Sequence, residues 1–133
     1  RMPEYCVDRA GRILNDRGKA VKGTKVLVLG VAYKQDIDDY RESPALRVIE
    51  ELEKRGAVVD FFDPWVKEYK YKGRKRTGLL VLTPETVRQY GLVMVTTAHT
   101  YLDYQMVQEN AAAIFDTKNV MKNIAVRDNI EIL

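Results

Sequence analysis

The chain has 133 residues, of which 46% are hydrophobic and 31% charged, and its formal net charge is +3 at pH 7. This length suits one domain with a hydrophobic core, since domains most often contain about 100–150 residues. No apolar stretch approaches the roughly 20 residues that cross a bilayer, so we expect no membrane span. The near balance of 22 basic and 19 acidic residues also argues against a nucleic-acid-binding domain, which usually carries a basic excess.

The amino-terminal residues and the cysteine content indicate the compartment. Residues 1–5 lack the apolar core of a secretory signal. The one cysteine, Cys6, cannot form an internal disulfide bond. We therefore expect a cytoplasmic protein. Arg1 ahead of Met2 indicates either an expression fragment or a processed chain.

Helical and strand patterns alternate along the sequence. Helices are predicted at 3–17, 44–55, from Pro84 onward and at 104–110, and strands at 24–29, 58–62, 79–82, 92–96 and 112–115. The basic segment 67–78 reads as an irregular, exposed loop. Such alternation predicts an α/β domain in three layers, with a parallel sheet between helices. We assign residues 1–23 to a leading helix and linker, and residues 24–133 to the domain itself.

One loop of this domain has the composition of a ligand loop. The apolar run at 24–29 ends at Gly30, and a charged loop then leads to Ser43 and Pro44, which suit the N-cap and first turn of a helix. Ligands of open α/β sheets bind at the carboxyl ends of the strands. Lys34 and Arg41 in this loop are therefore candidates for binding phosphate groups.

Two established phosphate motifs do not fit this loop. The dinucleotide fingerprint needs three glycines, and only Gly30 is present, so we reject an NAD domain in which Asp63 would bind the ribose. A Walker-type loop is excluded because Lys34 lacks the required glycine spacing and is not followed by Ser or Thr.

The loop belongs to a longer series of motifs: Gly-Val-Ala-Tyr-Lys (30–34), Asp36, Asp39, Arg-Glu-Ser-Pro (41–44), Gly-Ala (56–57), Asp-Pro (63–64), Val-Thr-Thr-Ala-His (95–99), Asp-Tyr (103–104) and Phe-Asp-Thr-Lys-Asn (115–119). This series resembles the carboxyl-terminal, UDP-binding domain of the UDP-glucose/GDP-mannose dehydrogenase family. The Asp-Tyr pair and the Arg-Asp-Asn-Ile ending (127–130) most resemble the UDP-N-acetylglucosamine 6-dehydrogenase branch.

The resemblance implies a Rossmann-like fold and assigns roles to four residues. Tyr33 and Lys34 would contact the UDP-sugar, although a solvated surface lysine is the alternative for Lys34. Arg41 would contact NAD that is bound mainly by an absent domain. Its alternative is an ion pair with an aspartate at 36, 38 or 39, and both can hold. Lys118 stands where the family usually has arginine, so its sugar-nucleotide contact would lack the bidentate fork. Asp116 and Asn119 would shape that turn by backbone hydrogen bonds or contact the ligand.

The implied parent enzyme oxidises UDP-N-acetylglucosamine, UDP-glucose or UDP-N-acetylmannosamine to the uronic acid with NAD, in polysaccharide biosynthesis. We expect the missing amino-terminal and central domains to be partners of this chain, and the parent to be a homo-oligomer. The family's catalytic cysteine lies upstream of these motifs, so we predict no catalytic residue here and no activity for the chain alone. The alternative is a stand-alone nucleotide-binding or protein-interaction domain without catalysis.

Three further features are interpreted as structural. His99, the one histidine, has no second ligand or nucleophile beside it, so we predict neither a metal site nor catalysis there. Cys6 fits a small buried hydrophobic residue. The run 67–76 interleaves tyrosines with cations, as single-strand nucleic-acid surfaces do, but one local basic loop is better explained by solvation.

Overall fold

The computed structural model describes residues 2–34, 36 and 38–133; Arg1, Gln35 and Ile37 lie outside the described residues. Helices and strands follow the chain in this order: α1 (Met2–Asp16), β1 (Lys25–Leu29), α2 (Pro44–Lys54), β2 (Val58–Phe62), β3 (Glu68–Tyr71), β4 (Arg74–Thr77), α3 (Pro84–Val87), β5 (Leu92–Val95), α4 (Tyr104–Asn110), β6 (Ile114–Asp116) and β7 (Ile130–Ile132).

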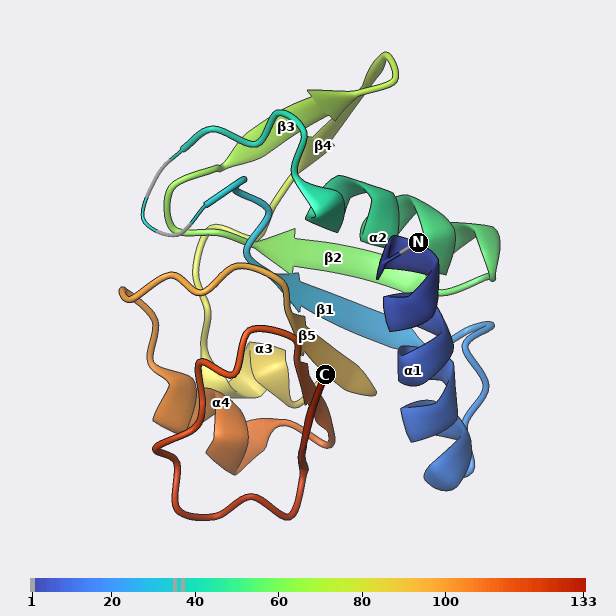
Figure 1. Ribbon diagram of the computed structural model, residues 1–133, viewed down its shortest axis with the longest axis vertical. Helices are drawn as coiled ribbons and strands as arrows, with labels where there is room; N and C mark the ends of the chain where they lie inside the picture. Colours follow the sequence, from blue (N-terminus) through green and yellow to red (C-terminus); the bar gives the residue numbers. More distant parts are fainter. Residues whose placement is uncertain (1, 35, 37) are drawn as a thin grey trace.

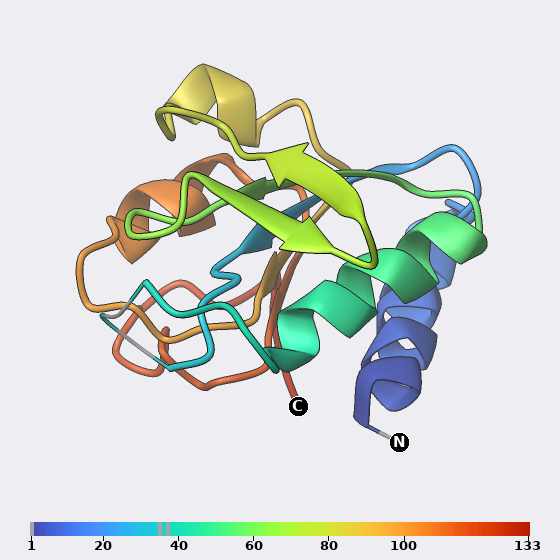
Figure 2. The same ribbon diagram turned by 90° about the horizontal axis from the view of Figure 1, so that it is seen from above.

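Five strands form one sheet in the order β2-β1-β5-β6-β7, and every pair is parallel (Figure 1). Alternate residues of β1 enter two separate hydrophobic clusters, Val26 and Val28 on one face and Leu27 and Leu29 on the other. Helices α1 and α2 cover the first face, and α3 and α4 cover the second (Figure 2). The predicted three-layer α/β fold with a leading helix is confirmed.

The predicted helices are confirmed, with bounds that differ by at most one residue. Helix α2 begins at the expected cap, where the Ser43 hydroxyl accepts a hydrogen bond from the Ala45 amide at 3.3 Å and Pro44 fills the first turn. Helix α1 places Ala10 and Leu14 in the core against α2. Among the described residues, no helix combines the length and apolar character that a bilayer crossing would need.

The basic segment 67–78 is not an irregular loop, which corrects the sequence prediction. It forms the antiparallel hairpin β3–β4, and its two-residue turn has φ of 51° at Lys72 and 80° at Gly73, as in the mirror-image turns that suit hairpins. Tyr69 is buried, 5.1 Å from the ring of Phe61 and 5.8 Å from the ring of Tyr40. The hairpin is therefore anchored to the core by its alternate residues.

One other strand prediction needs correction, and one strand was not predicted. Residues 79–82 form no strand, since only the Leu79 amide pairs with the β2 edge, donating to Phe61 O at 2.9 Å, while Leu80 and Val81 are exposed. At the opposite edge the sheet gains β7, which the sequence prediction missed. This three-residue strand pairs Ile130 with Ile114 of β6.

Candidate functional site

The candidate ligand residues follow the carboxyl ends of the parallel strands. Tyr33 and Lys34 follow β1, His99 follows β5 and Lys118 follows β6, so all lie toward the same edge of the sheet (Figure 1). The side chains of Tyr33, Lys34 and Lys118 are exposed, whereas His99 is fully buried. The expected position of the ligand loop at this edge is confirmed. The functional assignments of its residues stay predictions.

Asp63, directly after β2, organises this edge. Its Oδ2 accepts hydrogen bonds from the amides of Val31 at 2.8 Å and Ala32 at 3.1 Å, and its Oδ1 from those of Trp65 at 2.8 Å and Val66 at 3.0 Å. Burial raises the pKa of this carboxyl, but the hydrogen bonds from His99 and the backbone outweigh burial and hold the pKa below its ordinary value.

The saturation of Asp63 by its own chain has a functional consequence. The residue is 1% exposed. Its carboxylate therefore cannot serve a bound ribose, in agreement with the rejection of an NAD-binding fingerprint here. The side chain instead joins the start of the β1 loop to the turn after β2.

His99 connects Asp63 to the ligand loop. Its Nε2 lies 2.9 Å from Asp63 Oδ2, and its Nδ1 accepts a hydrogen bond from the Asp36 amide at 2.7 Å. A backbone amide can only donate, so Nδ1 is unprotonated and the ring proton lies on Nε2, which donates to Asp63. The sequence predicts a structural His99 but does not reveal its pairing with Asp63. The strand order β2-β1-β5 brings the two residues together on either side of the β1 loop.

Asp36 ties the loop to the segment after β5. Its carboxylate accepts hydrogen bonds from the Thr100 amide and hydroxyl, both at 3.0 Å, and these bonds lower the pKa of Asp36. Its φ of 61° is a left-handed conformation that aspartate tolerates better than most residues. Nearer the start of the loop, the Tyr33 amide donates to Asp39 O at 2.6 Å. Two described residues that flank Lys34, Tyr33 and Asp36, are thus each held by a backbone hydrogen bond, and the Lys34 ammonium lies 5.8 Å from the centre of the Tyr33 ring.

Gly30 permits the close approach of this loop to the segment after β5. Its φ is 94°, and a Cβ at this position would lie 2.5 Å from Thr97 Cβ. Thr97 itself is buried, and its hydroxyl donates to Ala32 O at 2.9 Å. The glycine is therefore required by both backbone conformation and space.

Arg41 makes an ion pair with Asp39, which the sequence gives as the alternative to a cofactor contact. Its Nε lies 3.1 Å from Asp39 Oδ1, and its side chain remains 82% exposed. This pair is surface-exposed and therefore weak, so it can exchange for a ligand contact. Arg41 also lines a concavity of about 450 Å³ between the start of α2 and β3, together with Arg47, Lys70 and Tyr71.

At the turn after β6, the acid Asp116 is buried and the base Lys118 is exposed. Asp116 is fully buried, and its carboxylate accepts hydrogen bonds from the amides of Lys118 at 3.1 Å and Met121 at 2.8 Å. Asn119 adopts a left-handed φ of 55°. The backbone-bonding alternative thus holds for Asp116. Lys118 is exposed. Burial raises the pKa of the Cys6 thiol, and the charges of Arg9 and Lys118 partly offset this effect. Cys6 is the buried residue that the sequence indicated.

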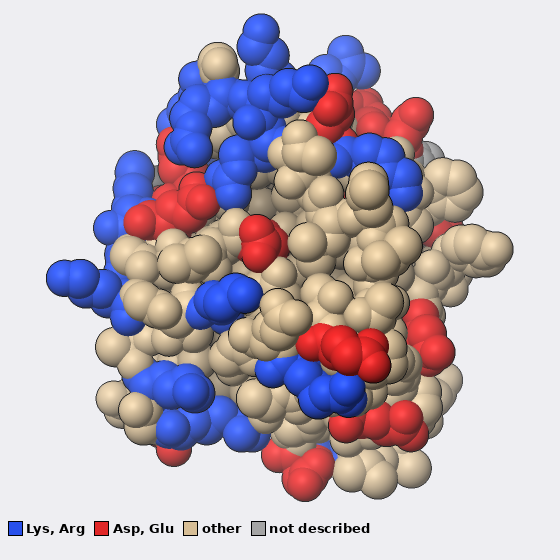
Figure 3. Space-filling view, turned by 180° about the vertical axis from the view of Figure 1, so that it is seen from behind, with Lys and Arg blue, Asp and Glu red and all other residues tan. Residues whose placement is uncertain are grey.

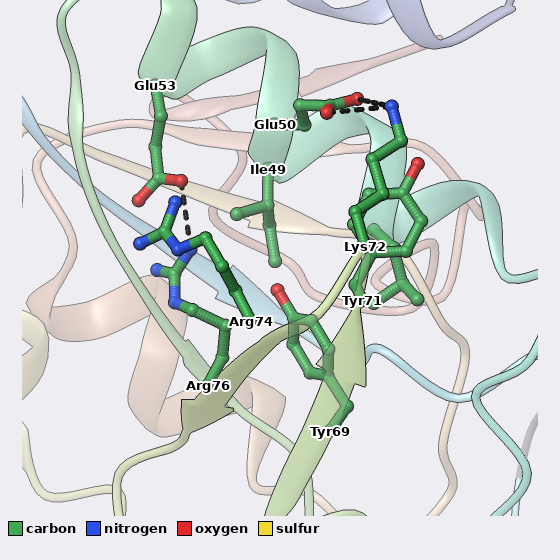
Figure 4. Close-up of a pocket in the computed structure, with 9 residues that line it drawn as sticks. Ile49, Glu50, Glu53, Tyr69, Tyr71, Lys72, Arg74 and Arg76 are labelled. Carbon is green, nitrogen blue, oxygen red and sulfur yellow. Dashed lines mark hydrogen bonds and ion pairs between the residues drawn. The ribbon is translucent and has the colours of Figure 1, made fainter.

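The β3–β4 hairpin gathers basic side chains at one end of the molecule (Figure 3). Two of these cations pair with acids of α2, Lys72 with Glu50 at 2.9 Å and Arg76 with Glu53 at 2.8 Å (Figure 4). The concavity between them holds only about 70 Å³, well below the roughly 300 Å³ of small ligand pockets. With Tyr69 buried as well, the hairpin is poorly suited to stack nucleic-acid bases.

An apolar groove of about 510 Å³ lies beside the same sheet edge. Trp65, Leu80, Val81 and Tyr101 line it and are each at least 46% exposed. Within residues 2–34, 36 and 38–133, no group of three or more His, Cys, Asp or Glu side chains is arranged to hold a metal ion.

Comparison with known proteins gives a consistent result. The profile of the UDP-glucose/GDP-mannose dehydrogenase family, UDP binding domain, matches residues 27–123. The chain is 30% identical over 127 residues to UDP-glucose 6-dehydrogenase of Rickettsia bellii, covering 90% of this chain and 29% of the relative. It is 27% identical over 123 residues to UDP-N-acetyl-D-glucosamine 6-dehydrogenase of Salmonella typhi, covering 92% and 28%.

A solved structure agrees with these sequence matches. The UDP-N-acetyl-mannosamine dehydrogenase Cap5O from S. aureus superposes with a TM-score of 0.72 at 30% identity, covering 98% of this chain and 30% of that protein. The chain thus spans less than a third of the length of each of these relatives.

Proposed function

Because the chain belongs to the UDP-glucose/GDP-mannose dehydrogenase family, as its UDP binding domain, we propose that it holds the UDP moiety of a nucleotide sugar at the carboxyl edge of its sheet. The observation that carries this proposal is the pair of hydrogen bonds at Tyr33 and Asp36 in the loop after β1. The amide of each of these residues donates a hydrogen bond, while the Lys34 side chain stays exposed. A preorganised cation at this edge suits the phosphates of a nucleotide.

Each predicted site residue has a role in this proposal. Lys34 offers a point charge to the diphosphate, and the Tyr33 ring, 49% exposed, offers a face for packing. Lys118 approaches the ligand from the turn after β6, as a single charge rather than an arginine fork. When the rest of the parent enzyme binds NAD, Arg41 would give up its ion pair with Asp39 and contact that cofactor on the neighbouring domain.

The parent activity that we propose is oxidation of a UDP-sugar primary alcohol to the uronic acid. The substrate is UDP-N-acetylglucosamine, UDP-glucose or UDP-N-acetylmannosamine, and NAD, when bound, would accept the hydrides. The described residues of this chain contribute binding rather than chemistry. Its one cysteine, Cys6, is buried with a raised pKa, so it presents no reactive thiolate. We expect the isolated chain to be inactive, and the parent to be a cytoplasmic homo-oligomer in which residues 1–23 lead from the central region.

The experiment is a titration of the ¹⁵N-labelled chain with UDP, followed by NMR, which detects even millimolar affinity. We expect the largest shift changes at residues 30–34, 36 and 117–119, and a weaker affinity for Lys34→Ala and for Lys118→Ala. Loss of one phosphate contact corresponds to about 1.5–3 kcal/mol, or roughly 10- to 150-fold in Kd.

Lys19→Ala is the matched control, because Lys19 is an exposed lysine in the linker before β1, at the opposite edge of the sheet. It removes the same charge without touching the site. If Lys19→Ala and Lys34→Ala lowered the UDP affinity equally, the loss would be explained by net charge alone. Shift changes that avoid the loop after β1 would refute the proposed site.

A further inference from the structure

We propose that His99 is the positioning residue that holds the Lys34 loop in its ligand-binding conformation. The inference rests on the proposed function, because Lys34 acts there as the phosphate contact. His99 touches no ligand in this scheme. It acts through the Asp36 amide, two residues beyond Lys34.

The orientation of the His99 ring is fixed from the core. Its Nε2 donates to Asp63 Oδ2 at 2.9 Å, and both residues are essentially inaccessible to solvent. Asp63 cannot turn, because four backbone amides hold its two oxygens. The backbone of His99 is held as well, because the Tyr104 hydroxyl donates to its carbonyl oxygen at 2.6 Å. The imidazole therefore presents Nδ1 to the loop in one direction only.

Asp36 responds to this nitrogen. Its amide donates to Nδ1 at 2.7 Å, and its backbone takes a left-handed φ of 61°, which L-amino acids rarely adopt. The Asp36 carboxylate is at the same time bonded to Thr100, the residue after His99. Without an acceptor at Nδ1, this amide loses its partner, and the left-handed conformation loses the one of these three bonds that is made by the backbone of Asp36 itself.

Two substitutions of His99 distinguish a purely structural role from a positioning role. Asparagine places a carbonyl oxygen where Nδ1 lies, so His99→Asn keeps an acceptor for Asp36 and loses the bond to Asp63. Glutamine places an amide nitrogen near Nε2, so His99→Gln keeps a donor for Asp63 and loses the acceptor for Asp36. Comparing these two variants therefore separates the contribution of His99 to the core from its contribution to the loop.

The first measurement uses the unaltered chain and needs no ligand. In a ¹⁵N-labelled sample, we expect a scalar coupling across the N–H···N hydrogen bond between the Asp36 amide nitrogen and His99 Nδ1. We also expect the ring nitrogen shifts of the Nε2–H tautomer and slow hydrogen exchange at Asp36. A ring proton on Nδ1, or an Asp36 amide that exchanges at the rate of an unstructured chain, would overturn the proposal even where both variants fail to fold.

The second measurement compares UDP affinity of the variants. We expect His99→Gln to raise the Kd by about tenfold and to abolish protection of the Asp36 amide, and His99→Asn to change the Kd by about twofold at most. Lys34→Ala should cause little further loss in the His99→Gln background, because the two residues act on one contact. Additive losses, or equal effects of the two His99 variants, would show a structural role only.

The outcomes keep this inference distinct from the proposed function. If the unaltered chain shows the Asp36–His99 coupling but UDP causes no shift changes, the UDP site is refuted and His99 orders a loop with another use. If UDP binds at Lys34 and His99→Gln binds it as tightly as the unaltered chain, the site stands and the positioning role is overturned.

Discussion

Replacing Asp63 by asparagine is expected to destabilise the fold by about 2–6 kcal/mol, although the two side chains have nearly the same shape. Asp63 Oδ2 faces three donors, and Oδ1 faces two. An asparagine can accept through only one of these positions, and its NH₂ group must face the donors at the other. The better orientation leaves the part-buried Trp65 amide and the buried Val66 amide without acceptors, at about 1–3 kcal/mol each.

The pH dependence of the free energy of unfolding provides a second test of the role of Asp63. The pKa of Asp63 is lowered in the folded chain, so its contribution is fully present above the unfolded value of about 3.9 and is lost as the pH falls through the folded value. The stability difference between the native chain and Asp63→Asn should therefore be largest at neutral pH and should shrink in acid below about pH 4.

The assay is urea unfolding followed by circular dichroism from pH 3 to pH 7. Asp16→Asn is the control, because Asp16 is exposed at the end of α1, and we expect a change within about 0.5 kcal/mol. A loss below about 1 kcal/mol for Asp63→Asn at pH 7, or a difference that does not shrink in acid, would refute the role of Asp63 as the buried acceptor of this edge.

Three further substitutions test the elements that support the site, each measured by urea unfolding. Gly30→Ala should cost about 2–4 kcal/mol, since it combines a φ of 94° with a clash against Thr97; a change under 1 kcal/mol would contradict the packing. Ser43→Ala should cost about 1 kcal/mol through the lost cap of α2, and Ser43→Gly much less. Tyr69→Ala should cost about 3–5 kcal/mol, because Tyr69 anchors the hairpin; exposed Tyr101→Ala, the matched control, should have almost no effect.

The sequence predicted the layers and the ligand edge because these depend on local patterns. Apolar runs at β1 and β5, the Ser-Pro start of α2 and the chain order of strands and helices suffice to place Lys34 at the carboxyl end of a parallel strand. Arg41 and its aspartate partner were also foreseeable, since residues two apart on a turn meet without tertiary help.

The missed features depend on contacts between distant segments. The hairpin turn uses Lys72 and Gly73 where Asn-Gly is the usual signal, so the basic composition hid the alternation that buries Tyr69. Residues 79–82 have a strand-like composition, but only the Leu79 amide bonds to the β2 edge, so they form no strand. The short strand β7 becomes stable only when β6 is in place, so its local sequence carries little information.

The arrangement of buried acids and exposed bases explains how the candidate site can be both rigid and accessible. Asp63 follows β2 and Asp116 is the last residue of β6, and each uses a buried carboxylate to bind the amides of a turn. The lysines proposed to bind phosphate, Lys34 and Lys118, lie on the loops that these carboxylates shape, with their own side chains in solvent. A buried acid can fix backbone without neutralising a surface base, because its charge is already satisfied by amide donors. An aspartate at the end of a parallel strand can therefore indicate a ligand loop without touching the ligand.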